Sequence, residues 1–297
     1  MKIIPGEVSV PKLHGYLLGA IGPRPIAFAS TVDAQGNRNL SPFSFFNVFS
    51  ANPPIAIFSP ARRGRNNTTK HTYENVKVIP EVVINIVSHA IVEQMSLSST
   101  EYGDGVDEFE KSGLTPIKSD LVKPFRVKES PVQLECKVIR VDELGDQGGA
   151  GNLVICEVVA IHIDDEILDE DGRIDPNKID LVGRMGGNWY VRASGDALFE
   201  IEKPLASLGI GVDSMPEEVR NSNILTGNDL GKLGNVEALP DETEVNDYKL
   251  MELSELHYNL ADYPEELEKR LHELAHDLLQ EGKVAEAWMC LLSFNNE

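Results

Sequence analysis

The sequence after Ser59 gathers the residue types that bind a small anion. Four basic side chains fall within nine residues, interleaved with hydroxyl and amide side chains: Arg62, Arg63, Arg65, Asn66, Asn67, Thr68, Thr69 and Lys70, followed by Thr72. Guanidinium forks, ammonium groups and the N-terminus of a helix predicted over about 66–76 all favour negative charge. Because the whole chain has a formal net charge of −21, this basic cluster indicates a phosphate site. A solvated basic loop is the alternative.

The C-terminal region contains a literal HExxH pattern, His272-Glu273-Leu274-Ala275-His276, on a predicted helix. In a zincin this spacing places two histidine ligands one helical turn apart and supplies a glutamate base. A zincin also needs a third ligand in a folded cleft, whereas this helix belongs to a short acidic region. Both histidines flank a leucine stripe, so packing or solvent exposure explains them. We therefore predict no metal site.

The elements that must position the basic cluster are short strands. Six segments have the composition and length of strands: 25–32, 39–50, 54–59, 80–86, 132–141 and 153–163. The glycine run 145–152 has strands on both sides and no helix after it, so it is typical of a hairpin loop. A second helix is predicted from Ser88 as its N-cap. Short antiparallel strands with few helices favour a closed or Greek-key β-barrel.

The segment from Gly22 to Ser59 has an order of motifs more specific than any single glycine pattern. In order, it contains Pro-Arg-Pro-Ile-Ala, then Ser-Thr, then the turn Asp-Ala-Gln-Gly-Asn at 33–37, then Asn-Leu-Ser-Pro-Phe-Ser, Pro-Pro and a strand ending in Ser. This order closely resembles the signature of the flavin reductase-like, FMN-binding split barrel family, which includes flavoredoxin-like proteins. Lys70-His71-Thr72 and the run from Gly183 to Tyr190 are similar to two later family motifs, so the resemblance spans about 10–200.

The resemblance implies a mainly β fold, a six-stranded antiparallel Greek-key split β-barrel with flanking helices, and a homodimer with FMN at or near the subunit interface. Residues at the ends of the first predicted hairpin have backbone groups that can edge the flavin ring: Ser30, Thr31, Asn39, Leu40 and Ser41. By resemblance, the phosphate is held by Ser59, Arg62, Lys70 and Thr72. By resemblance too, the other side of the ring is lined by Arg184, Gly186, Gly187 and Tyr190. The family usually has Asp where this chain has His71.

The function that the resemblance implies is an FMN-dependent oxidoreductase. Hydride or electrons would pass from NAD(P)H or a protein donor through FMN to an acceptor, with the flavin N5 carrying the chemistry, so no catalytic acid, base or nucleophile is required of the chain. FMN is expected over FAD because the basic cluster is compact and no GxGxxG turn follows a strand. The alternatives are a flavoredoxin-like carrier without NAD(P)H activity and a binding module that docks through its helical tail.

Charge divides the chain near Pro204. Residues 1–204 hold 21 Lys and Arg against 28 Asp and Glu, a net of −7, whereas residues 205–297 hold 6 against 20, a net of −14. We expect a barrel domain over 1–204 and an acidic, partly helical extension over 205–297, irregular to about 249 and forming a helical hairpin from Pro264 that breaks at Gly282. The charge argues against nucleic acid. The lack of a long apolar run argues against a membrane, and three separate cysteines indicate a reducing cytoplasm.

Overall fold

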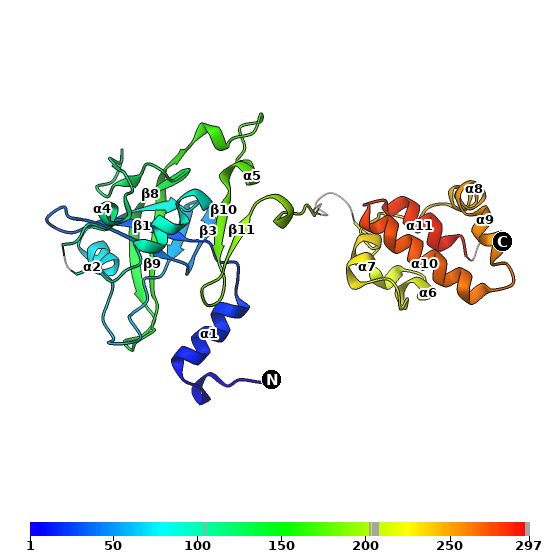
Figure 1. The fold of residues 1–297 in the computed structure, drawn as a ribbon, viewed down its shortest axis with the longest axis horizontal. Helices are drawn as coiled ribbons and strands as arrows, with labels where there is room; N and C mark the ends of the chain where they lie inside the picture. Colours follow the sequence, from blue (N-terminus) through cyan, green and yellow to red (C-terminus); the bar gives the residue numbers. More distant parts are fainter. Residues whose placement is uncertain (104, 202, 204–207, 295–297) are drawn as a thin grey trace. The chain divides into compact units, whose positions relative to one another are not determined.

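The computed structural model describes residues 1–103, 105–201, 203 and 208–294. The chain forms two compact units, Met1–Phe199 and Glu200–Glu297 (Figure 1). The compositional boundary expected at Pro204 lies outside the described residues. Each unit has its own hydrophobic core, which is described separately below.

The N-terminal unit is built on one antiparallel sheet, which confirms the mainly β fold with flanking helices. Seven strands pair in the order β2-β1-β5-β8-β9-β4-β3. Their bounds are β1 (Ala27–Val32), β2 (Arg38–Phe43), β3 (Phe46–Ala51), β4 (Pro54–Phe58), β5 (Glu81–Ile86), β8 (Val132–Glu143) and β9 (Asn152–Ile163). Seven strands replace the six expected because the segment 39–50 is two strands, not one.

A corner in the chain at Ser44 and Phe45 explains both the extra strand and the curl of the sheet. β2 and β3 lie at opposite edges of the sheet, yet only two residues separate Phe43 from Phe46. Three residues of extended chain span at most about 11 Å, so the sheet must curl until its two edges meet here. Phe43 and Phe46 both pack into the barrel core. Residues i and i+3 of one straight strand would face opposite sides, so the prediction of a single strand was wrong.

The first strand is buried on both faces, which fixes where the helices lie. Ala27 and Ala29 pack inside the barrel, whereas Ile26 and Phe28 belong to a second cluster that includes Met95. That cluster is covered by the helical segment η2 (His89–Ile91), α3 (Val92–Leu97) and α4 (Glu108–Ser112), and α2 (His71–Val78) also packs on β1 and β2. The helices α2, α3 and α4 therefore all contact β2.

One of the two expected helix starts moved. The helix predicted over 66–76 begins only at His71, because Asn67 adopts a left-handed conformation (φ 54°) and the chain turns before Lys70. Ser88 precedes a helical segment as expected, but its side chain forms no capping bond, and its backbone instead bridges to Leu181.

The smaller elements of this unit are η1 (Pro5–Glu7), α1 (Val10–Ala20), β6 (Pro116–Ile117), β7 (Arg126–Val127), η3 (Asp165–Ile167), α5 (Pro176–Ile179), β10 (Leu181–Arg184), β11 (Tyr190–Ala193) and η4 (Gly195–Ala197).

The C-terminal unit is helical. It contains η5 (Val212–Ser214), α6 (Glu217–Arg220), α7 (Gly227–Leu233), α8 (Glu242–Glu252), α9 (Ser254–Asn259), α10 (Pro264–Gln280) and α11 (Val284–Leu292). The last two are the helices expected on either side of Gly282. The irregular structure expected before residue 249 is wrong over 208–249: Thr226 and Asp241 form capping boxes, and Val219, Leu233 and Val245 are buried. These helices are too short to show a clear hydrophobic period.

Among the described residues, no helix has both the length and the apolar character needed to cross a bilayer.

Candidate functional site

Two adjacent cavities lie beside β2 in the N-terminal unit and have Ser99 in common. The first is lined by Asn39 and Ser41 of β2, by residues that precede or begin α2, and by the segment after α3: Arg63, Lys70, His71, Thr72, Ser98, Ser99, Thr100, Glu101, Tyr102 and Glu108. The second is lined by Ile26, Pro42, Ser44, Met95, Ser96, Ser99, Arg184 and Tyr190. Consecutive residues of β2, Ser41 and Pro42, face the two cavities.

The first cavity contains a cationic cluster, and we call it the cationic cavity: Arg63 and Lys70 line it together with the carboxyl groups of Glu101 and Glu108. Lys70, at the N-cap of α2, places its Nζ 3.7 Å from Glu101 Oε1, and Arg63 Nε lies 3.1 Å from the same oxygen. Arg65 pairs with the other oxygen of Glu101. Burial and the neighbouring Arg63 lower the pKa of the Lys70 ammonium. Three positive groups thus converge on one carboxylate in a chain that is strongly acidic elsewhere.

A buried polar network fixes the start of α2 against the β1–β2 hairpin. Asn39 Nδ2 donates hydrogen bonds to Thr31 Oγ1 at 3.2 Å and to Thr72 Oγ1 at 3.0 Å. Asn75 Nδ2, one turn along α2, donates to Thr31 Oγ1 at 3.0 Å. Thr31 and Thr72 are both buried. Thr31 is therefore bonded to a lining residue, whereas Asn39 and Thr72 themselves line the cavity.

Glu108 lines the first cavity and is bonded to β2. Its Oε2 accepts a hydrogen bond of 3.0 Å from the backbone N–H of Leu40, which lies on the edge strand β2. Burial raises the pKa of this carboxyl. The Leu40 side chain is buried in the core. The Leu40 backbone N–H, which was expected to edge the flavin ring, is bonded to Glu108 instead.

The second cavity has an aromatic and cationic wall. The Arg184 guanidinium lies 4.6 Å from the centroid of the Tyr190 ring, within cation–π range. Arg184 is positioned by Arg24, whose backbone exchanges hydrogen bonds with it at 2.9 Å and whose buried guanidinium donates to Met185 O at 2.9 Å and to Leu18 O at 2.7 Å. Arg24 therefore joins α1 to the start of the β10–β11 turn.

The two glycines of that turn shape the backbone. Gly187 has a φ of 59°, a conformation that glycine adopts at low cost. A Cβ on Gly186 would lie 3.0 Å from the Cα of Gly19, so its role is close contact with α1. Neither glycine lines the two cavities.

Five other expected site residues are also absent from both cavity walls: Thr31 and Leu40, described above, and Ser30, Ser59 and Arg62. Ser59 Oγ accepts from the backbone N–H of Asn152 at 3.0 Å, and Arg62 Nε donates to Asn67 Oδ1 at 2.7 Å. Both side chains hold the loop after β4, and the Arg62 backbone bonds to the 145–152 hairpin loop. Ser30 is buried in β1, and its Oγ has no hydrogen-bond partner in the described part of the chain.

The wall formed by residues 98–102 was not predicted from the sequence. The available signal was the run Ser96-Leu97-Ser98-Ser99-Thr100, in which hydroxyl side chains lie at and beyond the end of α3. Ser98 Oγ donates to Gln94 O at 3.1 Å and Ser99 Oγ to Ser96 O at 2.6 Å, so these hydroxyls end α3. Arg63 was recognised as basic, but spacing does not show which of three nearby arginines faces inward.

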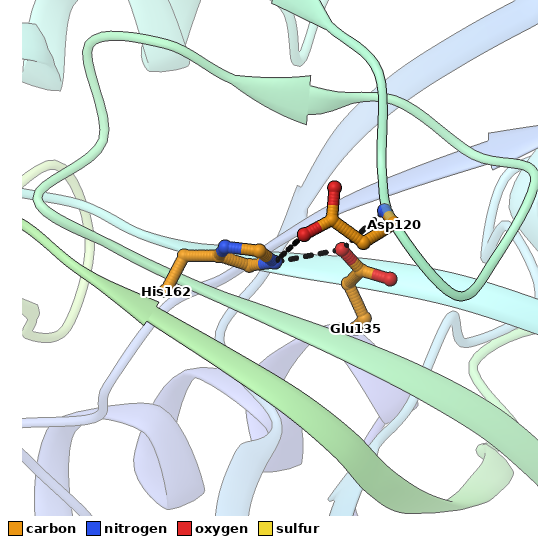
Figure 2. Close-up of side chains that lie close together, drawn as sticks. All are labelled: Asp120, Glu135 and His162. Carbon is orange, nitrogen blue, oxygen red and sulfur yellow. Dashed lines mark hydrogen bonds and ion pairs between the residues drawn. The ribbon is translucent and has the colours of Figure 1, made fainter.

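A separate cluster of titratable side chains joins the β6–β7 segment to the barrel (Figure 2). Fully buried Glu135 accepts hydrogen bonds from the backbone N–H groups of Asp120 at 2.8 Å and Leu121 at 2.6 Å, and its Oε1 lies 2.7 Å from His162 Nε2. Arg126 Nε lies 3.9 Å from the same oxygen. A neighbouring guanidinium disfavours a metal cation, so the contacts indicate a structural cluster.

The two histidines of the HExxH pattern fasten α10 to preceding segments. His272 Nδ1 lies 2.7 Å from Ser222 Oγ, and His276 Nδ1 lies 2.8 Å from Oδ2 of the buried Asp229, which also caps α7. Burial lowers the pKa of His272. The two imidazoles thus engage different partners and act as packing residues.

Comparison with known proteins identifies the class to which this fold and site belong. Residues 20–178 match the family model described as the flavin reductase like domain. An uncharacterized protein of Aquifex aeolicus is 37% identical over 201 residues, which cover 68% of this chain and 100% of the relative. The chain therefore belongs to the flavin reductase-like family.

Two solved structures share the fold. Nitrilotriacetate monooxygenase component B from Bacillus cereus is 30% identical with a TM-score of 0.63, and the match covers 68% of this chain and 98% of that one. A Shewanella frigidimarina protein assigned as a flavin reductase with a split barrel domain is 29% identical with a TM-score of 0.58, covering 68% and 99%. The curled sheet is thus a split barrel. Family membership supports flavin binding and an oxidoreductase class of activity.

Proposed function

We propose that this chain binds FMN across the two cavities and acts as an FMN-dependent oxidoreductase that takes electrons from NAD(P)H. The observation that carries the proposal is the pairing of a cationic cavity, with Arg63 and Lys70, and an adjoining cavity with an apolar and aromatic lining that includes Met95 and Tyr190. A terminal phosphate needs cations and hydroxyl donors, and a fused ring needs a flat, partly apolar wall. The chain offers both on one side of β2.

The residues divide into those that contact the cofactor and those that hold them. In the proposal, contacts are made by Asn39, Ser41, Arg63, Lys70, Thr72, Arg184 and Tyr190. The supporting residues are Ser30, Thr31, Leu40, Ser59, Arg62, Gly186 and Gly187. Bound flavin would supply hydride and electron transfer, and the protein would bind and orient it. Lys70 and Arg63 would neutralise phosphate charge, while Arg184 and Tyr190 would wall the ring.

The flavin itself tests the proposal. Freshly purified protein should absorb in the blue and near-ultraviolet, and denaturation should release FMN, because the cationic cavity is compact and suits one phosphate. The same preparation should oxidise NADH or NADPH when FMN is supplied. Stoichiometric FAD in the supernatant would contradict the choice of cofactor. A flavin spectrum without pyridine-nucleotide oxidation would favour the flavoredoxin-like carrier.

A second copy of the chain is the partner that we propose for an exposed apolar face. None of the described side chains of α1 is buried, and Leu17 and Ile21 are 52% and 64% exposed. On the edge strand β3, Val48 and Phe49 are 57% and 65% exposed. His14 of α1 contacts the ring of Phe45, which immediately precedes β3, so the two exposed segments are neighbours. Edge strands with apolar side chains are commonly covered by pairing or docking.

The residues used in both proposals lie in the N-terminal unit, which gives a test of separability. A chain ending at Pro204 should stay folded, retain FMN with the affinity of the full chain and sediment as a dimer, because its core is complete without the C-terminal unit. Sedimentation equilibrium and flavin titration measure both properties. A folded truncation that loses flavin would show that the C-terminal unit contributes to the site, and a monomeric full chain would reject the dimer.

A further inference from the structure

One carboxylate lies at the centre of the cationic cavity. Glu101, on the segment between α3 and α4, is bound by Arg63 Nε at 3.1 Å, by Lys70 Nζ at 3.7 Å and by Arg65 through its second oxygen. Each oxygen of the carboxylate therefore has a cationic partner. Desolvation opposes ionisation, yet the three surrounding cations hold the pKa of Glu101 below its usual value. The carboxyl group is thus an anion at neutral pH.

A carboxylate and a terminal phosphate are ligands of the same kind. A carboxylate presents a planar pair of acceptor oxygens and a phosphate presents a tetrahedral set. Both bind guanidinium and ammonium donors through charge-assisted hydrogen bonds. Two anions at one set of cations repel each other, so the second can enter fully only when the first withdraws. The contacts of Glu101 are those that an incoming phosphate would need.

The Glu101 side chain can leave without disturbing the fold. It is 40% exposed, and it is attached to a segment that follows the end of α3 and belongs to neither a helix nor a strand. Its contacts are with flexible side chains and not with the barrel core. Rotation of its side chain toward water is sufficient to free Arg63 and Lys70.

We propose that Glu101 is an internal stand-in for the flavin phosphate, so that the phosphate must displace this carboxylate to reach Arg63, Arg65 and Lys70. The inference rests on the proposed flavin site and adds a residue that sets its affinity and selectivity. Glu101 weakens the binding of phosphate-bearing flavins and leaves riboflavin, which has no phosphate, unaffected.

The test is a titration of apo protein with FMN and with riboflavin for wild type, Glu101→Gln and Glu101→Asp. Removing the competing charge should tighten FMN binding on the order of two- to fivefold, the size expected for a partly exposed ion-pair cluster, and should leave riboflavin binding unchanged. Glu101→Asp keeps the charge with a shorter reach, so its FMN affinity should fall between the other two. Glu266→Gln is the matched control, because Glu266 pairs with Lys269 and Arg270 in the C-terminal unit.

The outcomes separate the two levels of the proposal. Weaker FMN binding by Glu101→Gln would show that Glu101 holds the arginines in place, and an unchanged affinity would show that it leaves the phosphate alone; either result overturns the inference while the flavin site stands. A wild type that binds FMN no better than riboflavin would overturn the phosphate site and the stand-in together. Thermal unfolding of each variant confirms that the affinities compare folded proteins.

Discussion

Replacing Lys70 by alanine should weaken FMN binding about tenfold to a hundredfold and leave riboflavin binding almost unchanged. Lys70 is part-buried at the start of α2, lines the cationic cavity and carries one of the charges that the phosphate would meet. Loss of a hydrogen bond to a charged group costs about 1.5–3 kcal/mol, and each 1.4 kcal/mol is roughly a factor of ten in affinity. Only the phosphate-bearing flavin should register this loss.

Four affinities, from FMN and riboflavin titrated into wild-type and Lys70→Ala apo protein, measure the effect. Lys77→Ala is the control, because Lys77 lies in the last turn of the same helix and pairs with Glu143, outside both cavities. It should change neither affinity. If Lys70→Ala reduced FMN and riboflavin binding equally, Lys70 would be supporting the fold or the ring, and the phosphate site would have to be placed elsewhere.

Replacing Glu135 by glutamine should lower the free energy of unfolding by about 3 kcal/mol at neutral pH, the usual cost of breaking a buried ionic cluster. Glu135 is fully buried and serves two backbone N–H groups as well as His162. A glutamine retains only one acceptor oxygen. Its NH₂ group would therefore face another donor, either a backbone N–H or the imidazole, with no acceptor between them. The β6–β7 segment, which Glu135 joins to the barrel, should be the part of the fold that is destabilised most.

The effect should depend on pH with a defined sign. Desolvation opposes ionisation of Glu135, but the N–H groups of Asp120 and Leu121 and the contact with His162 lower its pKa in the folded state. A carboxyl with a lowered folded pKa stabilises the protein above its unfolded pKa of about 4.3, and that contribution is lost as the pH falls through the folded value. The gap between wild type and Glu135→Gln should therefore shrink below about pH 4.

Urea denaturation at pH 7 and at steps below pH 4.5 measures both quantities. Glu157→Gln, on the half-buried part of β9 opposite Lys137, removes the same charge without removing a buried acceptor of two backbone groups and serves as the control. Equal stability losses in the two variants would reject the special role of Glu135. Stabilisation of the wild type by Zn²⁺, absent in Glu135→Gln, would assign the cluster to metal binding instead.

Features of this protein that depend on neighbouring residues could be predicted from its sequence. The ordered motifs from Gly22 to Ser59 predicted the family and its split barrel, both of which the comparisons confirm. The leucine stripe predicted α10 and the break at Gly282. Turn residues, strand composition and helical periodicity depend on residues that are close together in the chain, so they can be recognised in the sequence.

Other features were decided only by tertiary packing. The corner at Ser44 separates β2 from β3. The alternation of side chains over 39–50 continues through this corner, so the sequence pattern does not reveal it. Arg62 and Arg63 are adjacent and chemically alike, yet the bond from Arg62 to Asn67 leaves Arg63 to face the cavity. Glu101 reaches the same cavity from more than thirty residues away. Which side chains meet in the cavity depends on how strands and helices that are far apart in the sequence pack together, and the spacing of neighbouring residues does not determine that packing.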